Sequence, residues 1–130
     1  MQSNAQSAVS VVSPEVLLQR ARDLVPQIAE RAEETAQNRR VPDETIQAMQ
    51  DAGLFRVLQP KAYGGYEMDP NVFYDIAMIL AEGCMSTAWI YGVIGVHNWQ
   101  LALFDPRAAA EVWRDDPDVR SASTYMPKGQ

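Results

Sequence analysis

The chain of 130 residues is the size of one domain, and its 47% hydrophobic and 22% charged residues are typical of a globular protein with its own core. A net charge of −6 without a basic cluster gives no electrostatic basis for binding nucleic acid or an anionic membrane. One cysteine, Cys84, and one histidine exclude an internal disulfide and a zinc centre, so we expect no metal and a reducing, cytoplasmic location.

The first predicted helix covers residues 14–38 and follows a polar arm. Residues 1–13 hold no basic segment and only a short apolar patch, so they do not resemble a secretory signal and are predicted to be flexible. Ser13 is the expected N-cap, Pro14 the first helical residue, and apolar residues then recur at helical spacing. Pro26 lacks a backbone donor and is expected to kink or split the helix.

Two further helices are predicted over residues 43–52 and 70–82. The second begins with Asp69 as its cap and Pro70 at the first helical position. Between the two helices, residues 63–66 read "YGGY" and predict a tight loop. A loop that a ligand approaches closely is the alternative.

The most apolar predicted helix covers residues 86–103. Ser86 is its expected N-cap, and apolar side chains on almost every face predict burial on most sides. Its longest apolar run, "AWIYGVIGV", has nine residues, too few to cross a bilayer. Gly92 and Gly95 each weaken a helix, which suggests that another backbone or a ligand approaches here.

The last predicted helix covers residues 106–114 and repeats the Asp-Pro start, with Asp105 as its cap and Pro106 at the first helical position. After this helix the pattern changes. Residues 119–125, "VRSASTY", are rich in β-forming residues and predict a strand, with the last ten residues extended. A single strand cannot form a sheet. We therefore predict a mainly α chain, with a helical domain at residues 14–116 and, at residues 117–130, the first strand of a β domain that continues in a longer protein.

The candidate catalytic residue is His97, the only histidine, which follows directly after the apolar run. One interpretation is a buried histidine that bonds a carbonyl or a hydroxyl. The other is an imidazole that binds a substrate and exchanges its proton near neutral pH. Helical spacing sets Ile90, Ile94 and Leu101 beside it, a wall that suits an aromatic substrate with one polar group and suits ordinary packing equally well.

Two segments carry a family resemblance. Residues 41–65, "VPDETIQAMQDAGLFRVLQPKAYGG", resemble the N-terminal helix and loop of the acyl-CoA dehydrogenase superfamily, with a proline-led helix, a Gly-Leu turn and Tyr-Gly-Gly. Residues 86–113, "STAWIYGVIGVHNWQLALFDPRAAAEVW", and residues 121–129, "SASTYMPKG", are similar to oxygenase components of two-component flavin-dependent monooxygenases. These include 4-hydroxyphenylacetate and 3-hydroxy-seco-steroid hydroxylases. The likeness covers roughly residues 40–130.

The resemblance implies an enzyme that hydroxylates an aromatic, phenolic substrate. Such enzymes take reduced FMN or FAD from a separate reductase, and O2 converts it to a flavin C4a-hydroperoxide that transfers oxygen to the ring. The implied partners are the aromatic molecule, the reductase and further copies in a homotetramer, with neither nucleic acid nor membrane. A β-barrel domain and a helical bundle would follow, so the chain is expected to be inactive alone.

The resemblance also implies roles for four residues. His97 would be catalytic, with the phenol oxygen as its only strong polar partner, and would raise the electron density of the ring by drawing the proton away. Trp89 would line the flavin and substrate cavity, and Ser123 and Thr124 would bond the flavin edge. Core packing for Trp89 and ordinary hydroxyls for the other two remain alternatives. Tyr125 departs from the Thr-Glu-Pro of the dehydrogenases.

Two other functions stay open from the sequence. One is an acyl-CoA dehydrogenase-like flavoprotein, and the other is a helical interaction module without activity. His97 favours the monooxygenase, because dehydrogenation of a thioester has no evident use for an imidazole at this position.

Overall fold

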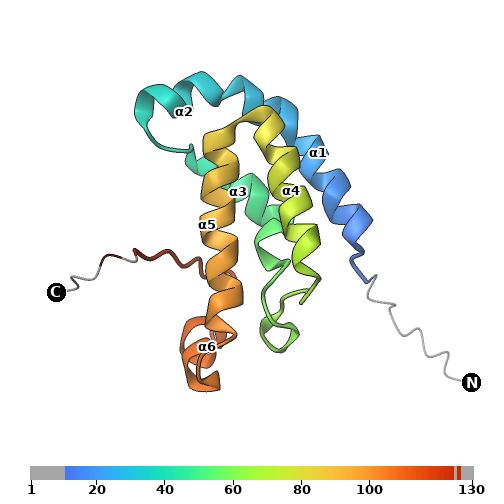
Figure 1. Ribbon diagram of the computed structural model, residues 1–130, viewed down its shortest axis with the longest axis vertical. Coiled ribbons are helices and arrows are strands. Elements are labelled where there is room, and N and C mark those ends of the chain that lie inside the picture. Colours follow the sequence, from blue (N-terminus) through green and yellow to red (C-terminus); the bar gives the residue numbers. More distant parts are fainter. Residues whose placement is uncertain (1–10, 125, 127–130) are drawn as a thin grey trace, which may run out of the picture.

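The computed structural model describes residues 11–124 and 126, which form six α-helices and two short 3₁₀ turns without a strand among them (Figure 1). The mainly α fold class is confirmed. In chain order the elements are α1 (Pro14–Glu30), α2 (Ala32–Asn38), α3 (Asp43–Asp51), η1 (Leu54–Arg56), η2 (Lys61–Tyr63), α4 (Pro70–Gly83), α5 (Met85–Leu101) and α6 (Pro106–Trp113).

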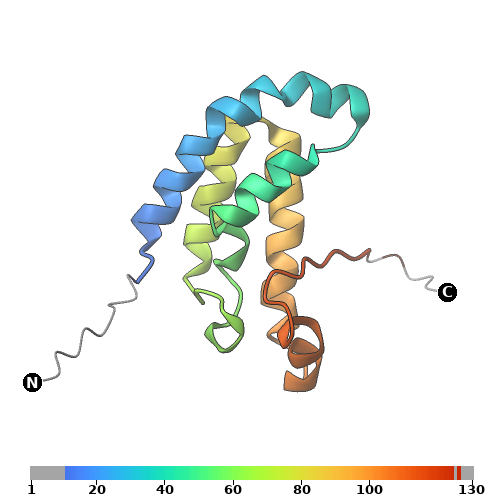
Figure 2. The same cartoon turned by 180° about the vertical axis from the view of Figure 1, so that it is seen from behind.

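Three long helices form the main layer. α4 lies between α1 and α5 and packs along both, and α3 crosses one side of this layer, as Figure 2 shows. Leu17 and Ile28 of α1, Ile76 and Leu80 of α4 and Tyr91 of α5 are almost fully buried in the shared core. Burial of an aliphatic side chain of this size stabilises a fold by about 1.5–3 kcal/mol, so tertiary packing holds these helices together.

Three helices begin at the capping residues that the sequence predicts. The Ser13 hydroxyl accepts a hydrogen bond from the Val16 amide, and the Asp69 carboxylate accepts one from the Asn71 amide. Asp105 caps α6 in the same way. A proline follows each cap at the start of the helix, where its missing N–H leaves no hydrogen bond unmade.

The first predicted helix is divided, but not at Pro26. α1 continues past this proline, and the backbone leaves helical geometry only at Arg31, with φ −94° and ψ 2°. Ala21 and Ile28, on either side of the proline, are both buried in the core. Their packing keeps the helix continuous, because tertiary contacts override a local preference of this size.

The predicted cap at Ser86 is wrong. α4 extends to Gly83, and Cys84 alone, with an extended backbone, connects it to α5, which begins at Met85. Ser86 therefore lies inside the first turn. Gly83 is required for packing, since a Cβ atom there would lie 2.9 Å from the Ile28 side chain of α1.

α5 is buried on one side only, which contradicts the prediction of burial on most sides. Met85 and Trp89 on its other side are 71% and 72% exposed. Among the described residues no helix has both the length and the apolar character to span a bilayer. The buried positions are Thr87, Ala88, Tyr91, Gly95, His97 and Asn98.

The two glycines of α5 have different surroundings. A Cβ atom on Gly95 would lie 2.4 Å from the ring of Phe73, so the close approach predicted here comes from an aromatic side chain of α4 and not from a backbone. At Gly92 a Cβ atom would meet nothing within 4 Å, so no close approach exists there among the described residues.

The segment after α6 does not form the predicted strand. Residues 117–124 and 126 have no strand assignment, while Tyr125 and residues 127–130 lie outside the described residues. A strand is stabilised by hydrogen bonds to a neighbouring strand, and the described residues offer none. The boundaries of the arm, the helical domain and the β domain stay predictions, and residues 1–10 of the arm also lie outside the description.

Candidate active site

His97 has hydrogen-bond partners on both sides of its ring and is only 7% exposed. Its Nδ1 atom lies 2.5 Å from the carbonyl oxygen of Val93, one turn earlier in α5. Its Nε2 atom lies 2.6 Å from the hydroxyl oxygen of Ser123. Because a carbonyl can only accept, Nδ1 carries a proton, and in the tautomer with its single proton on Nδ1 the Nε2 atom accepts the Ser123 proton.

This arrangement corrects one expectation. A substrate hydroxyl was expected to be the only strong polar partner of His97, but the Val93 carbonyl and the Ser123 hydroxyl already occupy that role. The residues alone left open whether the histidine bonds to a hydroxyl of the chain or to a ligand. In this structure it bonds to a hydroxyl that is itself exposed to solvent.

Of the two predicted hydroxyl residues, only Ser123 joins the histidine. Thr124 is exposed, and its hydroxyl oxygen accepts a hydrogen bond from the Met126 amide at 3.3 Å. Ser123 reaches α5 from a segment without regular secondary structure, 26 residues further along the chain. The two residues are therefore brought together by tertiary structure, not by a local motif.

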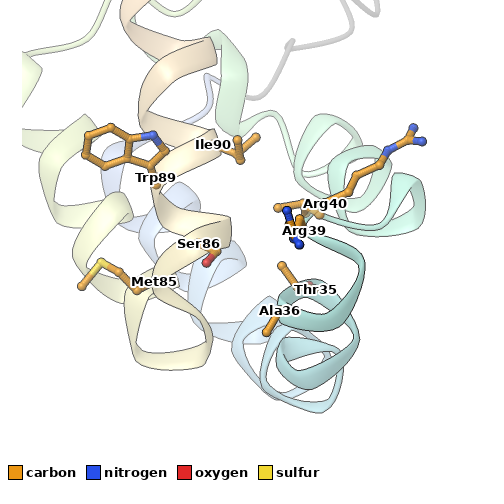
Figure 3. Close-up of a pocket in the computed structure, with 9 residues that line it drawn as sticks. Thr35, Ala36, Arg39, Arg40, Met85, Ser86, Trp89 and Ile90 are labelled. Carbon is orange, nitrogen blue, oxygen red and sulfur yellow. The ribbon is translucent and has the colours of Figure 1, made fainter.

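Trp89 lies just over two turns before His97 and lines two surface cavities. One of them, of about 500 Å³, lies between α2 and α5 (Figure 3). In the view of Figure 3 the Trp89 ring and the arginines of the cavity lie on opposite sides, and the guanidinium of Arg40 points away from the cavity. That guanidinium pairs with Asp43 at 2.7 Å. The lining residues are Thr35, Ala36, Arg39, Arg40, Val41, Met85, Ser86, Trp89 and Ile90.

The second cavity is an apolar groove between α4 and α5, also of about 500 Å³. Its walls are aliphatic and aromatic, and two of the lining residues, Val93 and Val96, lie within about one helical turn of His97. Such a surface suits a flat apolar ring system. The groove is lined by Phe73, Tyr74, Ala77, Met78, Ala81, Met85, Ala88, Trp89, Gly92, Val93 and Val96.

Two buried polar residues that the sequence did not single out fix α5 against η1. The Asn98 side-chain amide donates to the Phe55 carbonyl at 2.7 Å, and the Tyr91 hydroxyl donates to the Leu54 carbonyl at 3.2 Å. Burial raises the pKa of Tyr91, so this hydroxyl remains a donor. The signal that could have found Asn98 is its amide in an otherwise apolar helix, directly after the histidine.

No metal site competes with this arrangement in the described part of the chain. No group of three or more histidine, cysteine, aspartate or glutamate side chains there could hold a metal ion. The candidate site consists of the His97 imidazole of α5 and the Ser123 hydroxyl, beside an apolar groove.

Comparison with known proteins gives the family. Residues 14–106 match the acyl-CoA dehydrogenase N-terminal domain. The flavin-dependent monooxygenase oxygenase subunit HsaA of Rhodococcus jostii (strain RHA1) is 48% identical over 112 residues, which are 86% of this chain and 29% of the relative. The p-hydroxyphenylacetate 3-hydroxylase oxygenase component of Acinetobacter baumannii is 40% identical over 119 residues, 92% of this chain and 28% of the relative.

Solved structures agree with these relatives. The HsaA monooxygenase from M. tuberculosis matches with a TM-score of 0.86 and 45% identity, over 89% of this chain and 31% of that chain. XiaF from Streptomyces sp., solved in complex with FADH2 and glycerol, matches with a TM-score of 0.77 and 29% identity, over 82% and 27%. The chain thus spans less than a third of the proteins it matches. It belongs to the acyl-CoA dehydrogenase family through its N-terminal domain, and its relatives there are oxygenase components of flavin-dependent monooxygenases.

Proposed function

We propose that this chain is the N-terminal helical domain of an oxygenase component that hydroxylates a phenolic substrate with reduced flavin from a separate reductase. The observation that carries the proposal is the hydrogen bond of 2.6 Å between His97 and Ser123 beside an apolar groove. The names of the relatives support the reaction class, since they include an aromatic-ring hydroxylase and flavin-dependent monooxygenases.

The described residues fit a bound flavin on chemical grounds. The exposed Thr124 hydroxyl offers a hydrogen bond to a polar ring edge, and the groove with Trp89 and Val93 offers an apolar wall. When bound, reduced FMN or FAD supplies, with O2, the oxygen atom that is transferred. The complex of XiaF with FADH2 supports a reduced flavin and leaves the choice between FMN and FAD to experiment.

His97 and Ser123 would bind the phenol oxygen together. With the Nδ1 proton held by the Val93 carbonyl, Nε2 is the accepting atom of the ring, and the phenol hydroxyl would replace the Ser123 hydroxyl as its donor. The Ser123 hydroxyl can then turn to donate to the phenol oxygen. Drawing the phenol proton toward Nε2 raises the electron density of the ring carbon beside the hydroxyl, which must attack the transferred oxygen. This assignment moves Ser123 from the flavin edge to the substrate hydroxyl.

The activity test uses the complete oxygenase with reduced FMN or FAD, O2 and a panel of phenols that includes 4-hydroxyphenylacetate. We expect a hydroxylated product with one of the two flavins and not without a reductant. An acyl-CoA thioester with an artificial electron acceptor tests the dehydrogenase alternative. Reduction of the bound flavin by the thioester, without phenol hydroxylation, would overturn the proposal. We also propose a homotetramer in the cytoplasm, which sedimentation and cell fractionation test.

A further inference from the structure

Residues 54–59 support α5, the helix that carries His97. This stretch runs from η1 into the following loop, and it accepts hydrogen bonds from both Tyr91 and Asn98 through its first two carbonyl groups. Asn98 is the direct neighbour of His97 in the chain, and its bond to Phe55 is 2.7 Å long. The rotation of α5 around its own axis, and with it the direction of the imidazole, is thereby fixed relative to residues 54–55.

The same stretch also supports the segment that carries Ser123. The Gln59 side-chain amide donates to the Pro117 carbonyl at 2.9 Å, and the Arg56 guanidinium donates to the Asp118 carboxylate at 2.5 Å. Gln50 of α3 donates to the same carboxylate oxygen at 3.1 Å. We call Arg56, Gln59 and Asp118 the anchor. Both partners of the hydrogen bond between His97 and Ser123 thus depend on one stretch of six residues.

The Tyr-Gly-Gly loop makes this stretch rigid. The Gln59 side chain is 2% exposed, and its backbone carbonyl accepts a hydrogen bond from the Glu67 amide at 3.0 Å. Arg56 donates to the Gly64 carbonyl at 2.9 Å with the guanidinium nitrogen that does not bind the carboxylate. A Cβ atom on Gly65 would lie 1.9 Å from the Gln59 carbonyl oxygen. The close approach at the "YGGY" loop is therefore to the chain's own backbone.

The segment between Asp118 and Ser123 is long enough to move Ser123 away from His97 unless the anchor holds it. Five residue steps separate Asp118 from Ser123, and an extended segment of that length can reach about 17 Å. The segment has no regular secondary structure, and Arg120, Ala122 and Ser123 are exposed. The Trp113 indole donates to the Val119 carbonyl at 3.3 Å, so the bond of Ser123 lies at the end of a further four residues without regular secondary structure. One hydrogen bond there does not compensate for the conformational entropy of ordering these four residues.

We propose that Arg56, Gln59 and Asp118 are positioning residues that hold the Ser123 hydroxyl against Nε2 of His97. Released from the anchor, the segment moves away and the imidazole loses the hydroxyl that orients it. The catalytic consequence rests on the proposed function above, whereas the loss of the hydrogen bond does not. The two parts are therefore tested separately.

The structural test uses the single histidine of this chain. With ¹⁵N-labelled histidine, the spectrum of the 130-residue chain contains only His97, and the Nε2 resonance reports its hydrogen bond. Ser123→Ala should shift this resonance, and Asp118→Ala should shift it in the same direction. Asp118 is only half-buried, so this substitution leaves the core intact. Asp115→Ala is the matched control, because no hydrogen bond or ion pair engages that exposed carboxylate among the described residues.

The conservative substitution and a double variant make this test specific. Asp118→Asn keeps an oxygen acceptor for Arg56 and should retain most of the wild-type resonance position. In a Ser123→Ala background, Asp118→Ala should add no further shift, because the contact that it acts on is already absent. An unchanged His97 resonance in Asp118→Ala, or equal additional shifts in the double variant, would overturn the positioning role.

The kinetic test uses the complete oxygenase. A displacement of about 1 Å in a catalytic arrangement can cost about 10²-fold in rate, so Asp118→Ala should lower kcat by up to that factor with little change in KM and recover in Asp118→Asn. A rise in KM without a fall in kcat would overturn this part of the proposal. If the His97 resonance shifts as expected but neither Ser123→Ala nor His97→Ala affects hydroxylation, the anchor is upheld and the proposed function fails.

Discussion

At the scale of single residues, the proposed function predicts that His97 controls how well hydroxylation is coupled to oxygen consumption. In the complete oxygenase, His97→Ala should still consume O2 with reduced flavin, but product formation should slow by about 10²–10⁴-fold because a positioned acid–base group is lost. The oxygen should then appear as hydrogen peroxide. Rapid-mixing kinetics with product and peroxide assays measure this. His97→Asn, which restores a hydrogen bond but not proton transfer, should fall between the two.

One result for His97→Ala would contradict the catalytic role of the histidine. If His97→Ala forms product as fast and as completely as the wild type, His97 is a core histidine whose two hydrogen bonds serve only the fold. The melting temperature of the variant separates this case from simple unfolding.

Tyr91 makes a residue-scale prediction about stability and pH. Tyr91→Phe leaves the buried Leu54 carbonyl without its donor, which should lower the free energy of unfolding by about 1–3 kcal/mol near neutral pH. Burial raises the pKa of Tyr91 above its ordinary value of 10.0, so above that pH the unfolded chain loses a proton that the folded chain keeps. The wild type should therefore lose stability as pH rises through about 10.

Tyr91→Phe has no hydroxyl at position 91 to ionise, so it should not show this loss of stability at high pH. The difference in free energy of unfolding between the two proteins should therefore shrink in alkaline solution. Urea unfolding of both proteins at neutral pH and above pH 10 gives the comparison, and the remaining tyrosines act equally in both. A difference that stays constant or grows with pH would show that the Tyr91 hydroxyl is not held in the protonated form by burial.

At the scale of elements, the packing of α4 on α5 depends on one glycine. Gly95→Leu introduces bulk where a Cβ atom alone would lie 2.4 Å from the Phe73 ring, and overpacking of this kind costs about 1–3 kcal/mol. We expect a lower melting temperature in calorimetry. Gly92→Leu is the matched control in the same helix, since a Cβ atom there meets nothing within 4 Å.

For the control Gly92→Leu we also expect a defined change in melting temperature. Replacing an unencumbered helical glycine removes a penalty of roughly 1 kcal/mol, so Gly92→Leu should leave the melting temperature unchanged or raise it. Equal losses of stability in the two variants would contradict the view that Phe73 is what requires a glycine at position 95.

At the scale of the whole molecule, the apolar groove between α4 and α5 is open along its outer side. Trp89 is 72% exposed, and Tyr74 and Met78 are 60% and 63% exposed. The chain spans 29% of the length of its HsaA relative. We therefore expect the 130-residue chain alone to bind reduced flavin far more weakly than the complete oxygenase does. Anaerobic titration of Trp fluorescence measures both, and micromolar affinity of the chain alone would contradict this.

Whether residues 119–125 form a strand also depends on the whole molecule. Residues 119–125 have the composition of a strand, but its stability comes from the neighbour with which it pairs. We expect amide hydrogens of residues 119–124 to exchange rapidly in this chain and slowly in the complete oxygenase. Equal exchange in both proteins would show that this segment is not a strand of the β domain.

The sequence by itself determined the features that depend on neighbours in the chain. The caps at Ser13, Asp69 and Asp105 and the proline after each follow from local hydrogen bonding, so they could be predicted residue by residue. The family could be predicted as well, because its motifs lie in contiguous stretches. His97 could be singled out as the only imidazole, but its partners could not.

Only the tertiary structure decided what depends on contacts between distant segments. In the tertiary structure α1 continues past Pro26, one side of α5 is exposed, and the Phe73 ring packs against Gly95. Packing between helices outweighs the local conformational preference of single residues. The tertiary structure also pairs His97 with Ser123, 26 residues away in the chain. The spacing of residues along the sequence does not predict this contact. It arises because residues 54–59 hold both α5 and the distant irregular segment that carries Ser123.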